Sequence, residues 1–311
     1  MTDESAALSA GDLVEGADAA ALAELWREAA PSEPLEPWVI REKLVEDPEA
    51  DPALRLAATH GGRLIGAAAG VVRRGGPEGP TGFVQFLAVL PAYRRQGVAR
   101  RLLDELERRL AQRGAVRIRA FGGAPSYLWP GVDVRYTPAL CLFESRGYRV
   151  EGYEFNMAVD LTRPLPLEPP AARQAALARM GVTVRALTPD DEGPFHEWLQ
   201  RTWGPNWAFE GMLALRRPRP SGVVAVQHGR IVGFAVFDST RPGWFGPMGV
   251  EPGLQGGGIG VELCAQALQA MVERGYSEAQ IAWAGPRCFY ARKLGAVISR
   301  VFARMVKPVG P

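Results

Sequence analysis

The chain has 311 residues, of which 47% are apolar and 23% charged, and its formal net charge is only +2. This composition is typical of a globular protein with a sizeable core, and it excludes a disordered, collagen-like or coiled-coil chain. The longest run of apolar residues and glycine, 64–72, is far shorter than the roughly 20 residues of a spanning helix, which excludes an integral membrane protein.

The sequence also favours the cytoplasm. Its first residues lack the basic segment and the apolar core of a secretion signal. Three cysteines, Cys141, Cys264 and Cys288, are too few for a disulfide framework in a chain of this length. We therefore expect a cytoplasmic protein.

The first half of the chain is predicted to follow the order βααβββαβαβ, in which a first strand precedes two helices and a β-hairpin that turns at His60-Gly61-Gly62. A third strand then leads through a glycine-containing loop into a helix with one apolar face, and a short strand follows that helix. The predicted helices and strands are, in chain order, 17–30, 36–46, 54–59, 63–72, 83–89, 98–110 and 115–120.

A proline-rich segment divides the chain. Residues 162–170 contain four prolines, which predicts an extended linker between a first domain, 1–161, and a second domain, 171–311. The second domain repeats the element order of the first after one additional helix. Its predicted helices and strands are 171–180, 190–203, 207–215, 223–227, 231–237, 244–250, 259–271 and 279–284.

The two halves also match residue by residue where the third strand meets the glycine loop. Every matched residue recurs 161 positions later, with no gap across this stretch. The matched pairs are Val89 and Val250, Pro91 and Pro252, Gly97 and Gly258, and Ala99 and Gly260. A repeat in register indicates two copies of one structural unit.

The repeated loops, 94–99 and 255–260, stand where a strand leads into a helix. The first amide groups of a helix lack intrahelical partners and carry a partial positive charge, so they favour an anion such as a pyrophosphate. Gly97 and Gly258 permit close approach, and Arg94, Arg95 and Gln255 offer side-chain donors. Neither loop matches a Walker A motif, and the preceding hairpin disfavours a dinucleotide fold. A turn that merely connects strand and helix remains the alternative.

With Arg94-x-x-Gly97-x-Ala99 and Gln255-x-x-Gly258-x-Gly260, the chain resembles the GNAT acetyltransferase superfamily. The resemblance implies an α+β fold of two fused GNAT-like domains, each a mixed, mostly antiparallel sheet with helices on both faces. It also implies acetyl-CoA as co-substrate. The implied cofactor-binding residues are Leu87, Ala88, Val89, Arg94, Arg95, Gln96, Gly97, Val98, Ala99, Met248, Gly249, Val250, Gln255, Gly256, Gly257, Gly258, Ile259 and Gly260.

The family often carries a tyrosine on a late helix that protonates the departing thiolate. In the first half Phe143 stands at that position, whereas Tyr290 is the candidate general acid in the second half, with a tyrosine-to-glycine spacing one residue longer. We therefore expect the chemistry in the second half; the opposite assignment and a packing role for Tyr290 stay open. The strands before the loops contain no carboxylate, which leaves the general base to ordered water or to a carboxylate elsewhere such as Asp238.

An aromatic segment, 126–138, has no counterpart in the second half. Its residues Tyr127, Trp129, Asp133 and Tyr136 are candidates for an acceptor pocket, with a packing or interface role as the alternative. The three histidines are scattered without ligand spacing, so no metal site is expected. The arginines around the first loop suit CoA phosphates better than nucleic acid.

The expected function is acetyl-CoA-dependent N-acetyl transfer to a primary amine of a small molecule or peptide, by direct attack on the thioester. The expected partners are this acceptor alone, with no nucleic acid and no membrane, and the expected state is a monomer or homodimer. Two alternatives stay open. One is a tandem acyltransferase of thiol biosynthesis, similar to mycothiol synthases, and the other is a non-catalytic acyl-CoA-binding sensor or scaffold.

Overall fold

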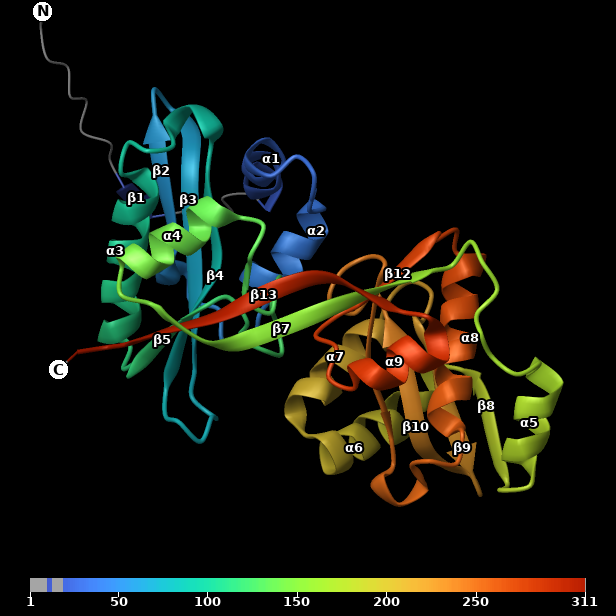
Figure 1. The fold of residues 1–311 in the computed structure, drawn as a ribbon. Helices are drawn as coiled ribbons and strands as arrows, with labels where there is room; N and C mark the ends of the chain where they lie inside the picture. The colour runs from blue at the N-terminus through green and yellow to red at the C-terminus, as the bar shows by residue number, and fades with distance from the viewer. Residues whose placement is uncertain (1–9, 13–18, 311) are drawn as a thin grey trace, which may run out of the picture. The chain divides into compact units, whose positions relative to one another are not determined.

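The structure is a computed structural model that describes residues 10–12 and 19–310 (Figure 1). It divides into two compact units. The first unit comprises Met1–Tyr153 with Phe302–Pro311, and the second comprises Glu154–Val301. Each unit is an α+β domain, as the resemblance implies.

The first unit is built on a sheet with the strand order β1-β2-β3-β4-β5-β13. Only β4 and β5 run parallel, so the sheet is mixed and mostly antiparallel. Its elements are β1 (Ala10–Asp12), α1 (Ala19–Ala29), α2 (Pro37–Ile40), β2 (Arg55–His60), β3 (Arg63–Arg73), β4 (Thr81–Val89), α3 (Val98–Gln112), β5 (Arg117–Ala120), β6 (Val132–Asp133) and α4 (Thr137–Ser145). The single helix predicted over 36–46 is instead α2 followed by a π-helical turn, Arg41–Val45.

The second unit repeats this plan with the order β7-β12-β11-β10-β9-β8, in which only β11 and β12 are parallel. The boundaries between the units fall within β7 (Arg149–Asp160) and β13 (Val297–Pro308). The other elements of the second unit are α5 (Pro170–Ala178), β8 (Val182–Ala186), α6 (Glu192–Trp203), α7 (Pro205–Leu215), β9 (Gly222–Gln227), β10 (Arg230–Phe237), β11 (Trp244–Val250), α8 (Ile259–Glu273), β12 (Glu278–Ile281) and α9 (Arg287–Leu294). The helix α5 is the additional one.

The two halves of the chain exchange their last strands. The end of β13 pairs with β5 of the first unit, from Met305 opposite Ala120 to Pro308 opposite Arg117. The end of β7 pairs with β12 of the second unit, with Asp160 opposite Glu278. The compact units therefore differ from the linear division into 1–161 and 171–311, because each sheet is completed by a strand from the other half. The proline-rich segment 162–170 lies within the second unit.

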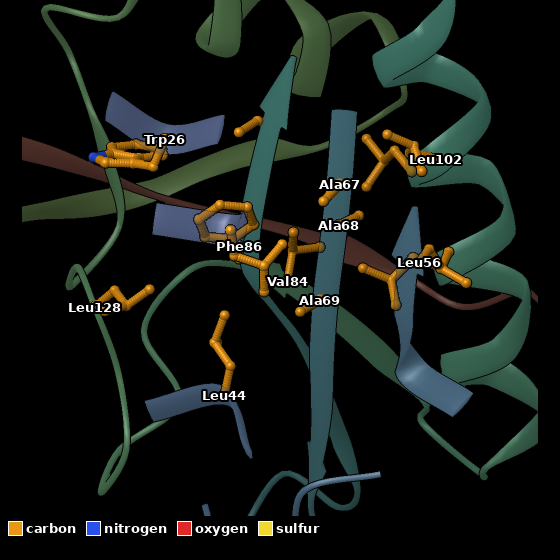
Figure 2. Close-up of a cluster of buried hydrophobic side chains, with 14 of the residues drawn as sticks. Trp26, Leu44, Leu56, Ala67, Ala68, Ala69, Val84, Phe86, Leu102 and Leu128 are labelled. Carbon is orange, nitrogen blue, oxygen red and sulfur yellow. The ribbon is translucent and has the colours of Figure 1, made fainter. Parts of the chain in front are cut away.

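The core of the first unit lies on both faces of the β3–β4 pair. Figure 2 shows Leu102 of α3 on one side and Trp26 of α1 on the other. The glycines of β3 let α3 approach closely: a Cβ at Gly70 would lie 2.7 Å from the carbonyl oxygen of Phe83 and 3.1 Å from a Leu106 methyl group. The predicted apolar stripe is fully buried and consists of Val98, Leu102, Leu103, Leu106 and Leu110.

The exchanged strand can be tested by truncating one of its core side chains. Met305, 1% exposed, packs in the core of the first unit, so Met305→Ala is expected to lower the free energy of unfolding by about 2–3 kcal/mol. Ile298, at 51% exposure on the same strand, is the matched control, and Ile298→Ala is expected to cost less than about 0.5 kcal/mol. Urea unfolding followed by tryptophan fluorescence measures both; equal small effects would contradict the strand exchange.

Candidate functional site

The strands β4 and β5 separate at the point where the glycine loop approaches. Their pairing runs from Thr81 opposite Arg117 to Val84 opposite Ala120, and the Phe121 N–H then donates to the Val84 carbonyl at 2.9 Å. The strand β4 continues to Val89 while β5 ends at Ala120. The backbone of β4 from residue 85 onward is therefore released from β5.

The second unit repeats this divergence 161 residues later. Phe245 of β11 lies opposite Ile281 of β12, and the Ala282 N–H donates to the Phe245 carbonyl at 3.1 Å. The strand β11 then continues to Val250. Both copies therefore keep a gap between the parallel strands of the sheet, which is a feature that sequence spacing alone does not reveal.

The first side chain of each loop motif bonds back to the preceding strand. In the first unit Arg94 donates from Nε to the Val89 carbonyl at 3.1 Å and from Nη2 to the Ala29 carbonyl at 2.7 Å. In the second unit Gln255 donates to the Val250 carbonyl at 3.3 Å. These residues hold the loop against the end of the strand, which explains why either arginine or glutamine serves at this position.

Each loop then turns through left-handed backbone into a helix. Gly97, with φ of +81°, precedes α3, and Gly258, with φ of +88°, precedes α8. Arg95 also has a positive φ, +62°, where the second copy has Gly256. Because the first helical bond of α3 is donated by Arg101 to Gly97, the amides of residues 98–100 have no partner within the helix. The loop thus presents three amides at a positive helix end, with Arg95 and Gln96 exposed beside them.

A cavity of about 910 Å³ joins the released strand, the loop and the aromatic segment of the first unit. The predicted residues of the first loop, 87–89 and 94–99, all line it, together with three of the four acceptor candidates, Trp129, Asp133 and Tyr136. The fourth, Tyr127, is 5% exposed and does not line the cavity. Residues 1–161 therefore bring their predicted site residues together, apart from Tyr127.

Glu33 lies behind the aromatic wall of the cavity, and sequence patterns did not point to it. Its carboxylate accepts a hydrogen bond from Trp129 Nε1 at 2.8 Å and one from the Tyr136 hydroxyl at 3.4 Å. Its backbone carbonyl accepts a 2.6 Å bond from Trp26 Nε1. The rings of Trp26 and Trp129 lie 4.6 Å apart. A single glutamate in a turn carries no sequence signal, since its partners lie up to 103 residues away.

A second carboxylate of the wall, Asp133, is 5% exposed and paired with Arg135. Arg135 donates from Nη2 at 2.8 Å and from Nε at 3.1 Å to both carboxylate oxygens. These hydrogen bonds raise the pKa of the Arg135 guanidinium above its ordinary value. Asp133 thus sits in the cavity wall as one member of an ion pair.

A buried polar network fixes the aromatic segment from below. Arg73 donates to both carboxylate oxygens of Asp47, at 2.7 and 2.5 Å, and to the Gly123 carbonyl at 2.9 Å. Gln85, the first released residue of β4, donates to Asp47 at 3.0 Å and to the Ser126 carbonyl at 2.9 Å. The network therefore ties the chain after β5 to the strand β4, and that chain continues into the cavity wall.

The corresponding surface of the second unit is packed with side chains. A Cβ at Gly257 would lie 2.7 Å from the methyl carbon of Met180, and one at Gly249 would lie 2.6 Å from an indole carbon of Trp203. Trp203 stacks on Trp207 with 4.7 Å between ring centroids. Met248 lies 3.4 Å from the Cys264 sulfur. Met180, in the turn after α5, thus lies against Gly257 of the second loop, and Trp203, at the end of α6, lies against Gly249 of the released strand β11.

Tyr290 lies in the core of the second unit. It is 5% exposed, and its ring contacts Phe289 and Phe245 at centroid distances of 5.3 and 6.5 Å. Burial raises the pKa of its hydroxyl well above the ordinary value, which disfavours the tyrosinate. A buried hydroxyl that stays neutral can act as a hydrogen-bond or proton donor, but it cannot act as a base.

Asp238 is engaged in the loop between β10 and β11. Its carboxylate accepts bonds from the Gly243 N–H at 2.7 Å and the Tyr276 hydroxyl at 3.1 Å, and Arg274 lies 3.7 Å away. Burial raises the pKa of this carboxyl group. Through these contacts the Asp238 carboxylate stabilises the conformation of its own loop.

Within 10–12 and 19–310, no group of three or more histidine, cysteine, aspartate or glutamate side chains is arranged to hold a metal ion. None of the helices in that part of the chain is both long and apolar enough to cross a membrane.

Comparisons with known proteins give one family. The model of the acetyltransferase (GNAT) family matches residues 19–126 and again residues 188–295. The mycothiol acetyltransferase of Salinispora tropica is 31% identical over 246 residues, which cover 72% of this chain and 70% of that protein.

Two solved structures share the fold. One contains a GCN5-related glucosamine N-acetyltransferase region in a fungal multi-domain GH3 beta-N-acetylglucosaminidase, with a TM-score of 0.76 at 19% identity; the match covers 96% of this chain and 38% of that one. This chain thus spans little more than a third of that protein. A tandem GNAT protein from the clavulanic acid biosynthesis pathway has a TM-score of 0.65 at 15% identity, with 98% and 99% covered. The chain belongs to the acetyltransferase (GNAT) family and is an acyltransferase with two such domains.

Proposed function

We propose that this chain transfers the acetyl group of acetyl-CoA to a primary amine of a small molecule or peptide, and that the chemistry takes place in the first unit. The observation that carries this proposal is the 910 Å³ cavity. It joins the released strand β4, the open amides at the start of α3 and an aromatic wall that includes Asp133 and has Glu33 behind it. The cavity thus places an anion-binding helix start beside an apolar acceptor surface.

The residues of the first loop fit acetyl-CoA. The amides of 98–100 and the exposed Arg95 suit its pyrophosphate, and the backbone of 87–89, which pairs with β3 but not with β5, suits the amide-bearing pantetheine arm. Acetyl-CoA supplies the thioester whose carbonyl the amine attacks. The wall formed by Trp26, Trp129 and Tyr136 excludes water from that carbonyl and orients the amine.

We place the acetyl transfer in the first unit, although the position of Tyr290 in the sequence favours the second unit. Tyr290 packs within a core, and Met180 and Trp203 lie against the loop and strand that would receive the cofactor there. In the first unit Ala88 stands at the position of Gly249, and it borders the cavity. Binding of acetyl-CoA to the second unit would require these side chains to move. This rearrangement costs binding free energy, and binding to the first unit does not require it.

The runner-up is an acyltransferase of thiol biosynthesis, which the 31% identity to a mycothiol acetyltransferase supports. In that case the acceptor is an amine carried by a thiol-containing precursor. The carboxylates of Glu33 and Asp133 and the aromatic rings of the wall fit both acceptor classes, an ordinary primary amine and an amine that also carries a thiol. The non-catalytic acyl-CoA sensor rests only on Phe143 at the usual position of the acid, and membership of an acetyltransferase family disfavours it.

Calorimetry with acetyl-CoA and a thiol-release assay over a panel of small amines, amino sugars and peptides separate these candidates. We expect binding of acetyl-CoA and thiol release with at least one amine. Release only with a cysteine-bearing amino sugar would favour the thiol pathway. Tight binding without release over the whole panel would favour the sensor, and the absence of binding would overturn the proposal.

The aromatic wall gives a direct prediction for the acceptor. Trp129→Phe removes the indole donor to Glu33 and is expected to raise the KM of the acceptor about fivefold to tenfold, since a hydrogen bond to a charged group is lost. The KM of acetyl-CoA is expected to stay within twofold. Trp38→Phe, at 40% exposure on α2, is the control with unchanged constants. Steady-state thiol release measures both; unchanged acceptor KM in Trp129→Phe would remove this wall from the acceptor site.

A further inference from the structure

We propose that Tyr136, supported by Glu33, is the proton relay of the first unit: Tyr136 protonates the departing CoA thiolate, and Glu33 is the positioning residue that resupplies its proton. The inference rests on the proposed function. It assigns the acid role to a residue outside the helix position at which the resemblance looks for it, and it joins two residues 103 positions apart.

The usual acid position is closed in the first unit. Phe143 is 0% exposed, and its ring contacts Tyr148 and Phe121 at centroid distances of 5.0 and 5.9 Å. The helix α4 instead presents Ala139 and Leu142 to the cavity. Neither side chain has a proton to give, so the acid must come from another element.

Tyr136 lies directly before α4, at the N-cap position, and lines the cavity. The other tyrosine of the cavity, Tyr93, is in the turn that follows β4, and its ring lies 5.7 Å from His60 of the hairpin. Tyr136 therefore belongs to the acceptor wall, beside Trp129 and Asp133, whereas Tyr93 belongs to the loop. Of the two hydroxyl groups, only that of Tyr136 is bonded to a carboxylate.

Glu33 is held in place to serve this hydroxyl. One carboxylate oxygen accepts the Tyr136 hydroxyl at 3.4 Å and the other accepts Trp129 Nε1 at 2.8 Å. Its main-chain carbonyl is fixed by Trp26 at 2.6 Å. The Arg135 guanidinium, which also faces Glu33 and Tyr136, is bound to the Asp133 carboxylate. Glu33 is thus a fixed hydrogen-bond acceptor for Tyr136 that does not itself line the cavity.

The proton path balances without any further reagent. The ammonium of the acceptor gives one proton to Tyr136 as Tyr136 passes its own to the Glu33 carboxylate. The neutral amine attacks the thioester carbonyl, the C–N bond forms and the C–S bond breaks. Tyr136 then gives its proton to the thiolate and takes the proton back from Glu33, while the second amine proton leaves to water. The products are the amide, the free thiol and one released proton.

Tyr136→Phe tests the relay, because it removes the hydroxyl and keeps the ring. We expect kcat with acetyl-CoA to fall about 100-fold and the KM of acetyl-CoA to stay within twofold. With S-acetyl thiophenol as donor, whose thiolate leaves without protonation, the deficit is expected to shrink to within about tenfold. Tyr153→Phe, at 54% exposure outside the cavity, is the matched control without effect.

Equal deficits with both donors would assign Tyr136 a merely structural role, and no deficit would remove it from the reaction; either result overturns the relay. Glu33→Gln, with Glu24→Gln on the exposed face of α1 as control, is expected to lower kcat at least about 20-fold at constant KM for acetyl-CoA. An unchanged kcat there also overturns the relay. Wild-type protein that binds acetyl-CoA and releases no thiol overturns the proposed function instead, so the two failures are distinguishable.

Discussion

Gly97→Glu is expected to lower thiol release from acetyl-CoA by at least about 100-fold, whereas Gly258→Glu is expected to retain most of the activity. Gly97 precedes α3 at the loop that lines the cavity, and a carboxylate there would face the pyrophosphate of the co-substrate. Juxtaposed like charges cost several kcal/mol, and about 2.7 kcal/mol already gives a 100-fold loss. In the second unit Met180 lies against Gly257, the neighbour of Gly258, so we expect this loop to contribute little to turnover.

The control for this pair is Gly114→Glu at the other end of α3. Gly114 also has a positive φ, +87°, and a Cβ there would meet no atom within 4 Å. It therefore carries the same backbone strain of about 1–2 kcal/mol without the charge near the loop. Calorimetry and thiol release on the three variants measure the effect. A larger loss in Gly258→Glu than in Gly97→Glu would move the chemistry to the second unit.

Arg73→Met is expected to lower the free energy of unfolding of the first unit by about 3–5 kcal/mol. The Arg73 and Asp47 side chains are 10% and 0% exposed, and removing one partner leaves a buried carboxylate uncompensated. The same change frees the carbonyl of Gly123, which Arg73 holds. Acceptor turnover is therefore expected to fall even at temperatures at which the variant is folded. Urea unfolding and thiol release measure the two effects.

The matched control is Arg63→Met. Like Arg73, Arg63 pairs with a carboxylate, that of Glu28 at 2.7 Å, but the Arg63 side chain is 57% exposed. Because water screens an exposed ion pair, this substitution is expected to cost no more than about 1 kcal/mol. Equal costs for Arg73→Met and Arg63→Met would mean that the buried network does not support the cavity wall.

The sequence predicted the features that follow from local pattern. The 161-residue offset predicted two units and both loops. The left-handed backbone also recurs at this offset, at Arg95 in the first loop and at Gly256 in the second. The apolar stripe of α3 is buried as its helical spacing requires. The expected fold class and family are confirmed.

The remaining features depend on contacts between distant residues. Pairing of β13 with β5 joins residues almost 190 positions apart. The sequence of either strand does not determine its partner, because many apolar strands can pair equally well. The Glu33 carboxylate is held by Trp129 and Tyr136, which lie 96 and 103 positions away in the sequence. The covering of Gly249 by Trp203 likewise follows from tertiary packing. These are the features that distinguish the two otherwise similar units.

A crystal structure with acetyl-CoA tests the central claim most directly. We expect the pantetheine arm between the separating strands β4 and β5 and the pyrophosphate at the amides of 98–100, with the thioester facing Tyr136. Acetyl-CoA bound only at the second loop, 255–260, would contradict it.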